Sequence, residues 1–159
     1  MTDPLDAYSR YAPALLRKCE RILASREDAE DIVQTLFGDL LRDGGPLPDF
    51  PYLFRAATNR ALNRLRDRRR RAALLERHGH AVLGGVVPPV DGRVVHLDLL
   101  ARLVDQLDPE TAEILVLRYL DHLDQQEIAD LIGRSRRTVH TRLADIRDRL
   151  AALAGEAAP

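Results

Sequence analysis

Apolar residues recur along most of this chain at the spacing of an α-helix rather than that of a β-strand. The clearest stripe runs from Ala29 to Leu41, with apolar side chains at i, i+3, i+4, i+7 and i+8, as in an amphipathic helix. Asp108 and Pro109 have the order of an N-cap residue followed by a helix-starting proline. Similar signals predict helices over about residues 5–23, 51–71 or beyond, and 97–107. The pattern therefore predicts an all-α protein.

Turn-forming residues and one aperiodic segment divide these helices into two groups. Residues 43–49 (DGGPLPD) separate the second helix from the third. Residues 78–95 lack helical periodicity and contain several glycines and a Pro-Pro pair, so we interpret them as a flexible linker. A short β-ribbon built from the valines of this segment is the alternative. The sequence predicts two small helical domains, residues 1–77 and 96–155.

Residues 124–150 (DQQEIADLIGRSRRTVHTRLADIRDRL) have the layout of a helix-turn-helix. Asp124 and Glu127 have the spacing of a capping box at the start of the first helix. Gly133 lies where the chain must turn with a positive φ, and Ser135 is a favourable N-cap for the second helix. In this motif the second helix enters the major groove of DNA. The alternative is an ordinary helical hairpin whose basic face is solvated.

Charge is segregated along the chain, although its formal net charge is only −1. Residues 55–77 contain nine arginines against two acidic residues. Residues 5–43 contain six basic and eight acidic residues. This asymmetry indicates one surface for a polyanion and another surface for a different partner.

Several classes of function lack the residues that they need. Cys19 is the only cysteine, so no intrachain disulfide and no cysteine-based zinc site can form, and its place on an apolar stripe predicts a buried side chain. The sequence has no phosphate-binding glycine loop, no HExxH pair and no nucleophile–base set, and its five histidines lack ligand spacing. We therefore expect no enzymatic activity, no cofactor and no metal. The absence of a signal-peptide pattern and of a long apolar run leads us to expect a cytoplasmic protein without membrane insertion.

The chain resembles bacterial RNA polymerase sigma factors of the extracytoplasmic-function (ECF) type. In the first domain the resemblance rests on residues 11–13 (YAP), 28–37 (DAEDIVQTLF) and 52–59 (YLFRAATN). In the second domain it rests on residues 107–110 (LDPE), 117–119 (LRY) and the helix-turn-helix. It implies a region 2-like domain that binds core polymerase and the promoter −10 element. It also implies a region 4-like domain that binds the −35 element.

The second helix carries the expected polymerase-binding face. Its polar side chains on the face away from the apolar stripe are Asp28, Asp31, Gln34 and Thr35. In the family, the matching face docks on the clamp helices of the largest polymerase subunit, and an acidic ridge suits a basic partner. Thr35 departs from the acidic residue often found at that position. A solvated surface is the alternative interpretation of this face.

The resemblance further implies that the protein contacts the flap region of the second-largest polymerase subunit and that an anti-sigma factor restrains it.

The third helix and the loop before it carry the expected −10 surface. In the family, the loop that corresponds to residues 44–50 captures an extruded base, which needs stacking and hydrogen bonds to the base edge. Tyr52 stands where the family often has tryptophan. The aromatic residues Phe50, Tyr52 and Phe54 could equally belong to the apolar core, and for Phe54 we favour that interpretation. The arginines would hold phosphates, although a solvated helix end is the alternative. The expected contacts are Phe50 and Tyr52 for stacking, Asn59 and Asn63 for base edges, and Arg60, Arg64, Arg66 and Arg68 for phosphates.

The start of the last helix carries the expected −35 surface. Arginine prefers the O6 and N7 atoms of guanine, whereas short hydroxyl side chains more often bind phosphate. Arg134 replaces the apolar residue common after the turn glycine and is expected either to point outward or to loosen the turn. The residues expected to read bases are Arg136, Arg137, His140 and Arg142, and those expected to bind phosphate are Ser135, Thr138 and Thr141.

The resemblance implies a protein that binds core RNA polymerase and directs promoter-specific initiation through both DNA elements. A stand-alone helix-turn-helix regulator, dimeric through its first domain, is the main alternative. A sigma mimic that sequesters an anti-sigma factor is the third, and the arginine-rich helix argues against it because sequestration needs no DNA surface.

Overall fold

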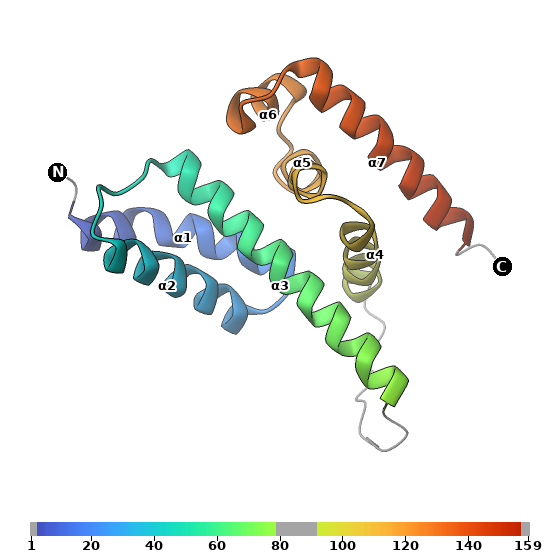
Figure 1. Cartoon of the computed structure of the whole chain (residues 1–159), viewed down its shortest axis with the longest axis horizontal. Helices are drawn as coiled ribbons and strands as arrows, with labels where there is room; N and C mark the ends of the chain where they lie inside the picture. Colours follow the sequence, from blue (N-terminus) through green and yellow to red (C-terminus); the bar gives the residue numbers. More distant parts are fainter. Residues whose placement is uncertain (1–2, 79–91, 157–159) are drawn as a thin grey trace.

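The computed structural model describes residues 3–78 and 92–156, and within these ranges it contains seven helices and no strand (Figure 1). This confirms the predicted all-α class. The helices are α1 (Pro4–Leu23), α2 (Arg26–Asp43), α3 (Phe50–His78), α4 (Gly92–Gln106), α5 (Pro109–Tyr119), α6 (Gln125–Ile132) and α7 (Arg136–Glu156).

The first three helices form a bundle around the apolar stripes of the sequence. α1 lies against both α2 and α3, and its inward residues Leu15, Cys19 and Ile22 have no exposed surface. The chain turns between α1 and α2 at Ala24, which has a φ of 48°, and Ser25 then caps α2. The stripe of α2 is buried as predicted, apart from its end.

The ends of the apolar stripes extend past the packed core. Leu41, in the last turn of α2, is 56% exposed, and Leu5, in the first turn of α1, is 72% exposed. Helical spacing predicts only the side of the helix on which a residue lies, and a partner must also reach that turn before the residue is buried.

Helix α3 continues beyond residue 71, as the prediction allowed, whereas α4 begins earlier than predicted. Arginine, alanine and leucine are good helix formers, and the next glycine after residue 50 is Gly79, so the helix continues to His78. α4 starts at Gly92, within the segment 78–95 that the sequence predicts to be a linker. The rest of that segment, including the part where a β-ribbon was the alternative, lies outside the described residues.

The second group of helices is built around α5. Its residues from Thr111 to Leu117 are all buried, as expected for a helix that is covered on every side. α3, α6 and α7 all contact it, and α4 lies against α3 and α7. Asp108 caps α5 and Pro109 occupies its first turn, as the sequence predicts.

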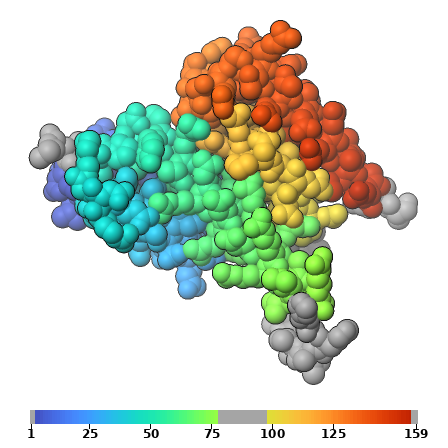
Figure 2. Space-filling model, viewed as in Figure 1, coloured from blue at the N-terminus to red at the C-terminus, as the bar shows by residue number. Residues whose placement is uncertain are grey.

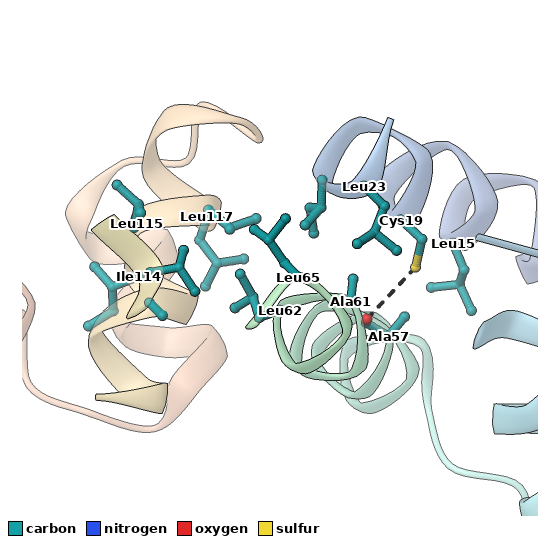
Figure 3. Close-up of a cluster of buried hydrophobic side chains, with 14 of the residues drawn as sticks. Leu15, Cys19, Leu23, Ala57, Ala61, Leu62, Leu65, Ile114, Leu115 and Leu117 are labelled. Atoms are coloured by element: carbon teal, nitrogen blue, oxygen red, sulfur yellow. Dashed lines mark hydrogen bonds between the residues drawn. The ribbon is translucent and has the colours of Figure 1, made fainter. Parts of the chain in front are cut away.

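The two groups of helices are packed directly against each other (Figure 2). Leu62 and Leu65 lie on the side of α3 toward Leu117 of α5, whereas Ala57 and Ala61 lie on the side toward α1 (Figure 3). All of these side chains are buried, and the core is continuous across the two groups of helices. The described part of the chain therefore forms one packed body.

Cys19 lies inside the first bundle, as the sequence predicts. Its Sγ–H donates to the carbonyl oxygen of Ala57 at 3.7 Å (Figure 3). Burial raises the pKa of the Cys19 thiol to about 11. The reactive thiolate form is therefore scarce at neutral pH.

None of the described helices combines the length and apolarity needed to cross a bilayer.

Replacing Leu15 by alanine should lower the free energy of unfolding by about 2–5 kcal/mol, because it leaves a cavity in the core of the first bundle. The matched change Leu41→Ala removes a mostly exposed side chain and should change that free energy by less than about 0.5 kcal/mol. Urea unfolding followed by circular dichroism measures both values. Equal losses for the two variants would contradict the packing of α1.

Candidate promoter and polymerase interfaces

The helix-turn-helix is held by local hydrogen bonds that its sequence predicts. Asp124 Oδ1 accepts hydrogen bonds from the backbone N–H groups of Gln126 and Glu127, each at 2.8 Å. Glu127 Oε2 in turn accepts from the N–H of Asp124 at 2.8 Å, which completes the capping box. Gly133 ends α6 with a φ of 68°, a conformation that favours glycine. The turn between α6 and α7 is therefore fixed locally.

The start of α7 presents the predicted −35 residues to solvent. Ser135 Oγ accepts from the N–H of Thr138 at 3.1 Å, so Ser135 caps the helix. The side chains of Arg136, Arg137 and His140 are exposed, and none of them has a hydrogen-bond or ion-pair partner among the described residues. Ser135 and Thr141 are also exposed and Thr138 is half-buried. The opposite face, with Val139, Leu143 and Ile146, is buried.

Arg142 and Arg134 differ from the other basic residues of this surface, because both bind acids at the start of α5. Arg142 Nη1 lies 3.1 Å from Asp108 Oδ2 and 3.2 Å from Thr111 Oγ1. Arg134 Nε donates to Glu110 Oε2 at 2.9 Å, so Arg134 points outward from the turn toward this acid. Both arginines thus tie α7 and its turn to α5. Helical spacing did not reveal this role of Glu110, since the pairing depends on how α5 and α7 cross.

Asp108 is the centre of this attachment. Burial opposes its ionisation, but hydrogen bonds from Thr111 and the charge of Arg142 outweigh that effect and lower the pKa of the carboxyl group. Its Oδ1 accepts from the N–H of Thr111 at 3.0 Å, so the same carboxylate caps α5 and holds α7.

The predicted polymerase-binding ridge on α2 divides into two parts. Asp28 is half-buried, and Arg64 and Arg68 of α3 both bind it. Ser25 caps α2 through the N–H of Asp28, but the Asp28 side chain turns to these arginines and does not complete a capping box. Asp31, Gln34 and Thr35 are exposed, and Asp31 has one ion pair, to Arg64 at 2.5 Å. The outward part of the ridge therefore begins at Asp31.

Three of the predicted −10 arginines form a row that lies along the acids of α2. Arg60, Arg64 and Arg68 are four residues apart and so share one side of α3. Arg60 Nη2 lies 2.8 Å from Asp39 Oδ2, and this hydrogen bond lowers the pKa of the Asp39 carboxyl group. Arg68 also donates to the carbonyl oxygen of Leu23 at 2.7 Å. These guanidinium groups hold α2 against α3 in this structure.

A polar hollow of about 230 Å³ between α2 and α3 brings the two predicted surfaces together. Two of its lining residues, Asp31 and Thr35, come from the polymerase-binding set, and three come from the −10 set. Asn63 is exposed at this hollow, whereas Asn59 is half-buried. The hollow is lined by Asp31, Ile32, Thr35, Arg60, Asn63, Arg64 and Asp67.

The aromatic residues expected to stack on a base are not together. Phe50 packs between Tyr11 and Phe54, with ring centroids 5.2 and 5.7 Å apart. Tyr52 is 55% exposed and stands apart from this cluster. Phe54 packs against the core, which agrees with the favoured reading of the sequence. Of the three aromatic side chains, Tyr52 is the one most available to a ligand.

Comparison with known proteins matches both halves of the chain to one family. Residues 7–71 match the model of Sigma-70 region 2, and residues 97–150 match that of Sigma-70 region 4. The chain is 27% identical to the ECF RNA polymerase sigma factor SigW of Bacillus subtilis, over 87% of this chain and 81% of that protein. It is 29% identical to the RNA polymerase sigma factor CarQ of Myxococcus xanthus, over 95% of this chain and 88% of that protein.

Comparison with solved structures also gives a match. The matched structure contains the sigma factor RpoE of Bartonella quintana in complex with the anti-sigma factor NepR, and the comparison gives a TM-score of 0.49 at 18% identity. The match covers 95% of this chain and 96% of that chain.

The two matched sigma regions stand in the family's order and together span most of the sequence. The chain therefore belongs to the sigma-70 family as a sigma factor of the ECF type, a protein that directs RNA polymerase to promoters.

Proposed function

We propose that this sigma factor reads the −35 element with the exposed start of α7. The observation that carries the proposal is the contrast between the two faces of that helix. Val139, Leu143 and Ile146 anchor one face in the core, while Arg136, Arg137 and His140 project from the other without partners among the described residues. A fixed helix with free basic side chains is the arrangement that major-groove recognition requires. Ser135, Thr138 and Thr141 bind the adjacent phosphates.

Within this proposal Arg142 holds α7 in place and reads no base. It is bound to Asp108 and Thr111, and a base contact would require that attachment to break. Arg136, Arg137 and His140 then carry the sequence preference, since their side chains have no such attachment.

The −10 surface in this proposal extends from Tyr52 to the arginine row of α3. Tyr52 and Asn63 are exposed, so they are available for stacking and for a base edge. Arg60 and Arg64 are each about one-third exposed and lie at the polar hollow, where a phosphate would exchange with the carboxylates of α2. Arg68 is more firmly engaged by Leu23 and Asp28.

The polymerase-binding face in this proposal consists of Asp31, Gln34 and Thr35, which meet the clamp helices of the largest subunit. Their exposure supports this assignment, as does the fit of acidic and amide groups to a basic partner. The second domain meets the flap region of the second-largest subunit. We further propose that the protein acts in the cytoplasm by binding rather than by catalysis, and that an anti-sigma factor restrains it.

Run-off transcription with purified core enzyme tests the proposed activity. Adding the full chain should produce transcripts from its own promoters, and the protein should co-elute with core enzyme. A stand-alone regulator would instead bind a palindromic duplex tightly in the absence of polymerase. Failure both to co-elute and to support any transcript would contradict the proposal.

Replacing Arg137 by alanine should weaken initiation at promoters that depend on the −35 element. A lost bidentate contact to guanine costs about 1–3 kcal/mol of binding free energy. Arg147→Ala is the matched control, because Arg147 is also an exposed arginine of α7 but lies outside the proposed contact surface. Run-off yield measures the loss, and co-elution with core enzyme should be the same for both variants. Loss of core binding in Arg137→Ala would refute the assignment.

Replacing both Asp31 and Gln34 by alanine should reduce affinity for core enzyme at least about tenfold, because a hydrogen bond to a charged group contributes about 1.5–3 kcal/mol. The matched control is Asp6→Ala with Ser9→Ala, an exposed acidic and polar pair of the same spacing on α1. Fluorescence anisotropy with labelled core enzyme measures both affinities. An equal loss in the two variants would show that the ridge is not the docking face.

A further inference from the structure

A hollow of about 870 Å³ lies where α1 faces the second group of helices. None of the residues assigned above to promoter or polymerase contacts lines it. Its volume lies within the range of about 300–1,000 Å³ that is common for small-molecule sites. We call it the leucine hollow, because more than half of its lining residues are leucines of α4, α7 and the segment of α5 that ends at its C-cap: Leu99, Leu100, Leu103, Leu115, Leu120 and Leu150.

The leucines form an apolar wall. Leu103 and Leu115 are buried, and the other four leucines are half-buried, so they present part of their surface. Tyr119, which is 42% exposed, is the one polar side chain that the second group of helices contributes to the described lining. Water against such a wall forms no hydrogen bonds with it, so an apolar ligand gains free energy by displacing that water. A polar ring such as a nucleobase would instead leave its edge groups without partners.

The facing wall is a polar stripe of α1. Its residues are spaced i, i+3, i+4 and i+7, so they share one side of the helix; they are Arg17, Glu20, Arg21 and Ala24. Arg17 is exposed, and it has no hydrogen-bond or ion-pair partner among the described residues. The leucine hollow therefore has an unpaired cation across from an apolar wall.

The other two charged side chains of this stripe are already engaged. Glu20 lies 3.3 Å from Arg26, which does not line the hollow. Arg21 lies 3.9 Å from Asp121. The charge of Arg17 is consequently the one that remains to be neutralised, and it favours an anionic group at the polar side of the hollow.

We propose that the leucine hollow binds a long-chain fatty acid, with the carboxylate at Arg17 and the alkyl chain along the leucines. A guanidinium group pairs with a carboxylate through two parallel hydrogen bonds. An alkyl chain gains free energy from each buried methylene group and needs no polar partner. A single unpaired cation suits a ligand with one charged head and offers no continuous track for a polyanion. The site goes beyond the proposed function, because binding here requires neither DNA nor polymerase.

Displacement of cis-parinarate, a fatty acid that fluoresces in apolar surroundings, measures binding to the full chain. The sequence contains no tryptophan, so the protein's own emission interferes little. Laurate, used below its critical micelle concentration, should displace the probe in a saturable manner. Each methylene group removed from the competitor should weaken its binding about two- to fourfold, and acetate should not compete. Failure of the probe to bind, or of laurate to displace it, would overturn the proposal.

Replacing Arg17 by glutamate tests the recognition of the carboxylate. The change should weaken laurate binding at least about tenfold, because it removes a charge-assisted hydrogen bond and places a like charge beside the carboxylate. Dodecanol has the same chain and an uncharged head, so it should bind the parent chain and this variant equally. Arg10→Glu is the matched control, since Arg10 is also an exposed arginine of α1 and does not line the hollow. An equal loss of laurate binding in both variants, or no loss in either, would refute the proposal.

Replacing Leu150 by glutamine tests the apolar wall. Laurate and dodecanol should both bind at least about fivefold more weakly, because the chain would then lie against an amide group that it cannot satisfy. Leu75→Gln is the matched control, since Leu75 is a 64% exposed leucine of α3 outside the hollow. A Leu150→Gln protein that is helical by circular dichroism and binds both ligands as the control does would contradict the site. If Leu150→Gln does not remain helical, Arg17→Glu decides the question, because its exposed side chain lies outside the core.

These measurements are independent of the proposed function, since they contain neither polymerase nor promoter. Failure of the chain to support run-off transcription with core enzyme would contradict the proposed function and leave the fatty-acid site standing. Absence of saturable laurate binding would remove the site and leave promoter recognition untouched.

Discussion

The packing of α3 between α1 and α5 is the contact on which the rest of this structure depends. One side of α3 is small, with Ala57 and Ala61 against α1, and the next side is large, with Leu62 and Leu65 against the second domain (Figure 3). Both sides are buried, so a single helix belongs to the core of each domain. The arginines that flank these packed sides therefore lie along their edges, whereas Arg70, Arg71 and Arg77 are exposed.

That constraint explains why most of the basic residues of α3 are already engaged. Arg60, Arg64 and Arg68 lie at the edge facing α2. The edge facing the second group of helices carries Arg55, Arg66 and Arg69, which bind Glu113, the carbonyl oxygen of Leu107 and Asp105. A guanidinium group close to a carboxylate gains a charge-assisted hydrogen bond without leaving the surface. The charges of most of these arginines are therefore balanced by acids of the same chain in this structure. The exposed start of α7 is not paired in this way.

The two proposed DNA-binding surfaces consequently differ in how much of each could be predicted. At α7 the apolar stripe, the N-cap and the turn glycine define the outward face, so Arg136, Arg137 and His140 are exposed as expected. Arg142 was expected to face outward with them, yet it binds Asp108. At α2 and α3 the spacing placed the acids and arginines on polar faces correctly. The spacing did not show that the polar face of α2 meets the polar face of α3, because that contact depends on how closely the two helices approach.

The sequence by itself determined the helices, their caps and the sides that are buried, because hydrogen bonding and apolar spacing within a helix are local. The capping box of Asp124 and Glu127 and the positive φ of Gly133 follow from a few neighbouring residues. Only the tertiary structure decided which charges pair, and it did so across long separations, as with Lys18 and Asp121. An ion pair forms where two chain segments approach within a few ångströms, and no periodic pattern encodes that approach. The same holds for the contact between the domains, which joins the two halves of the chain into one body.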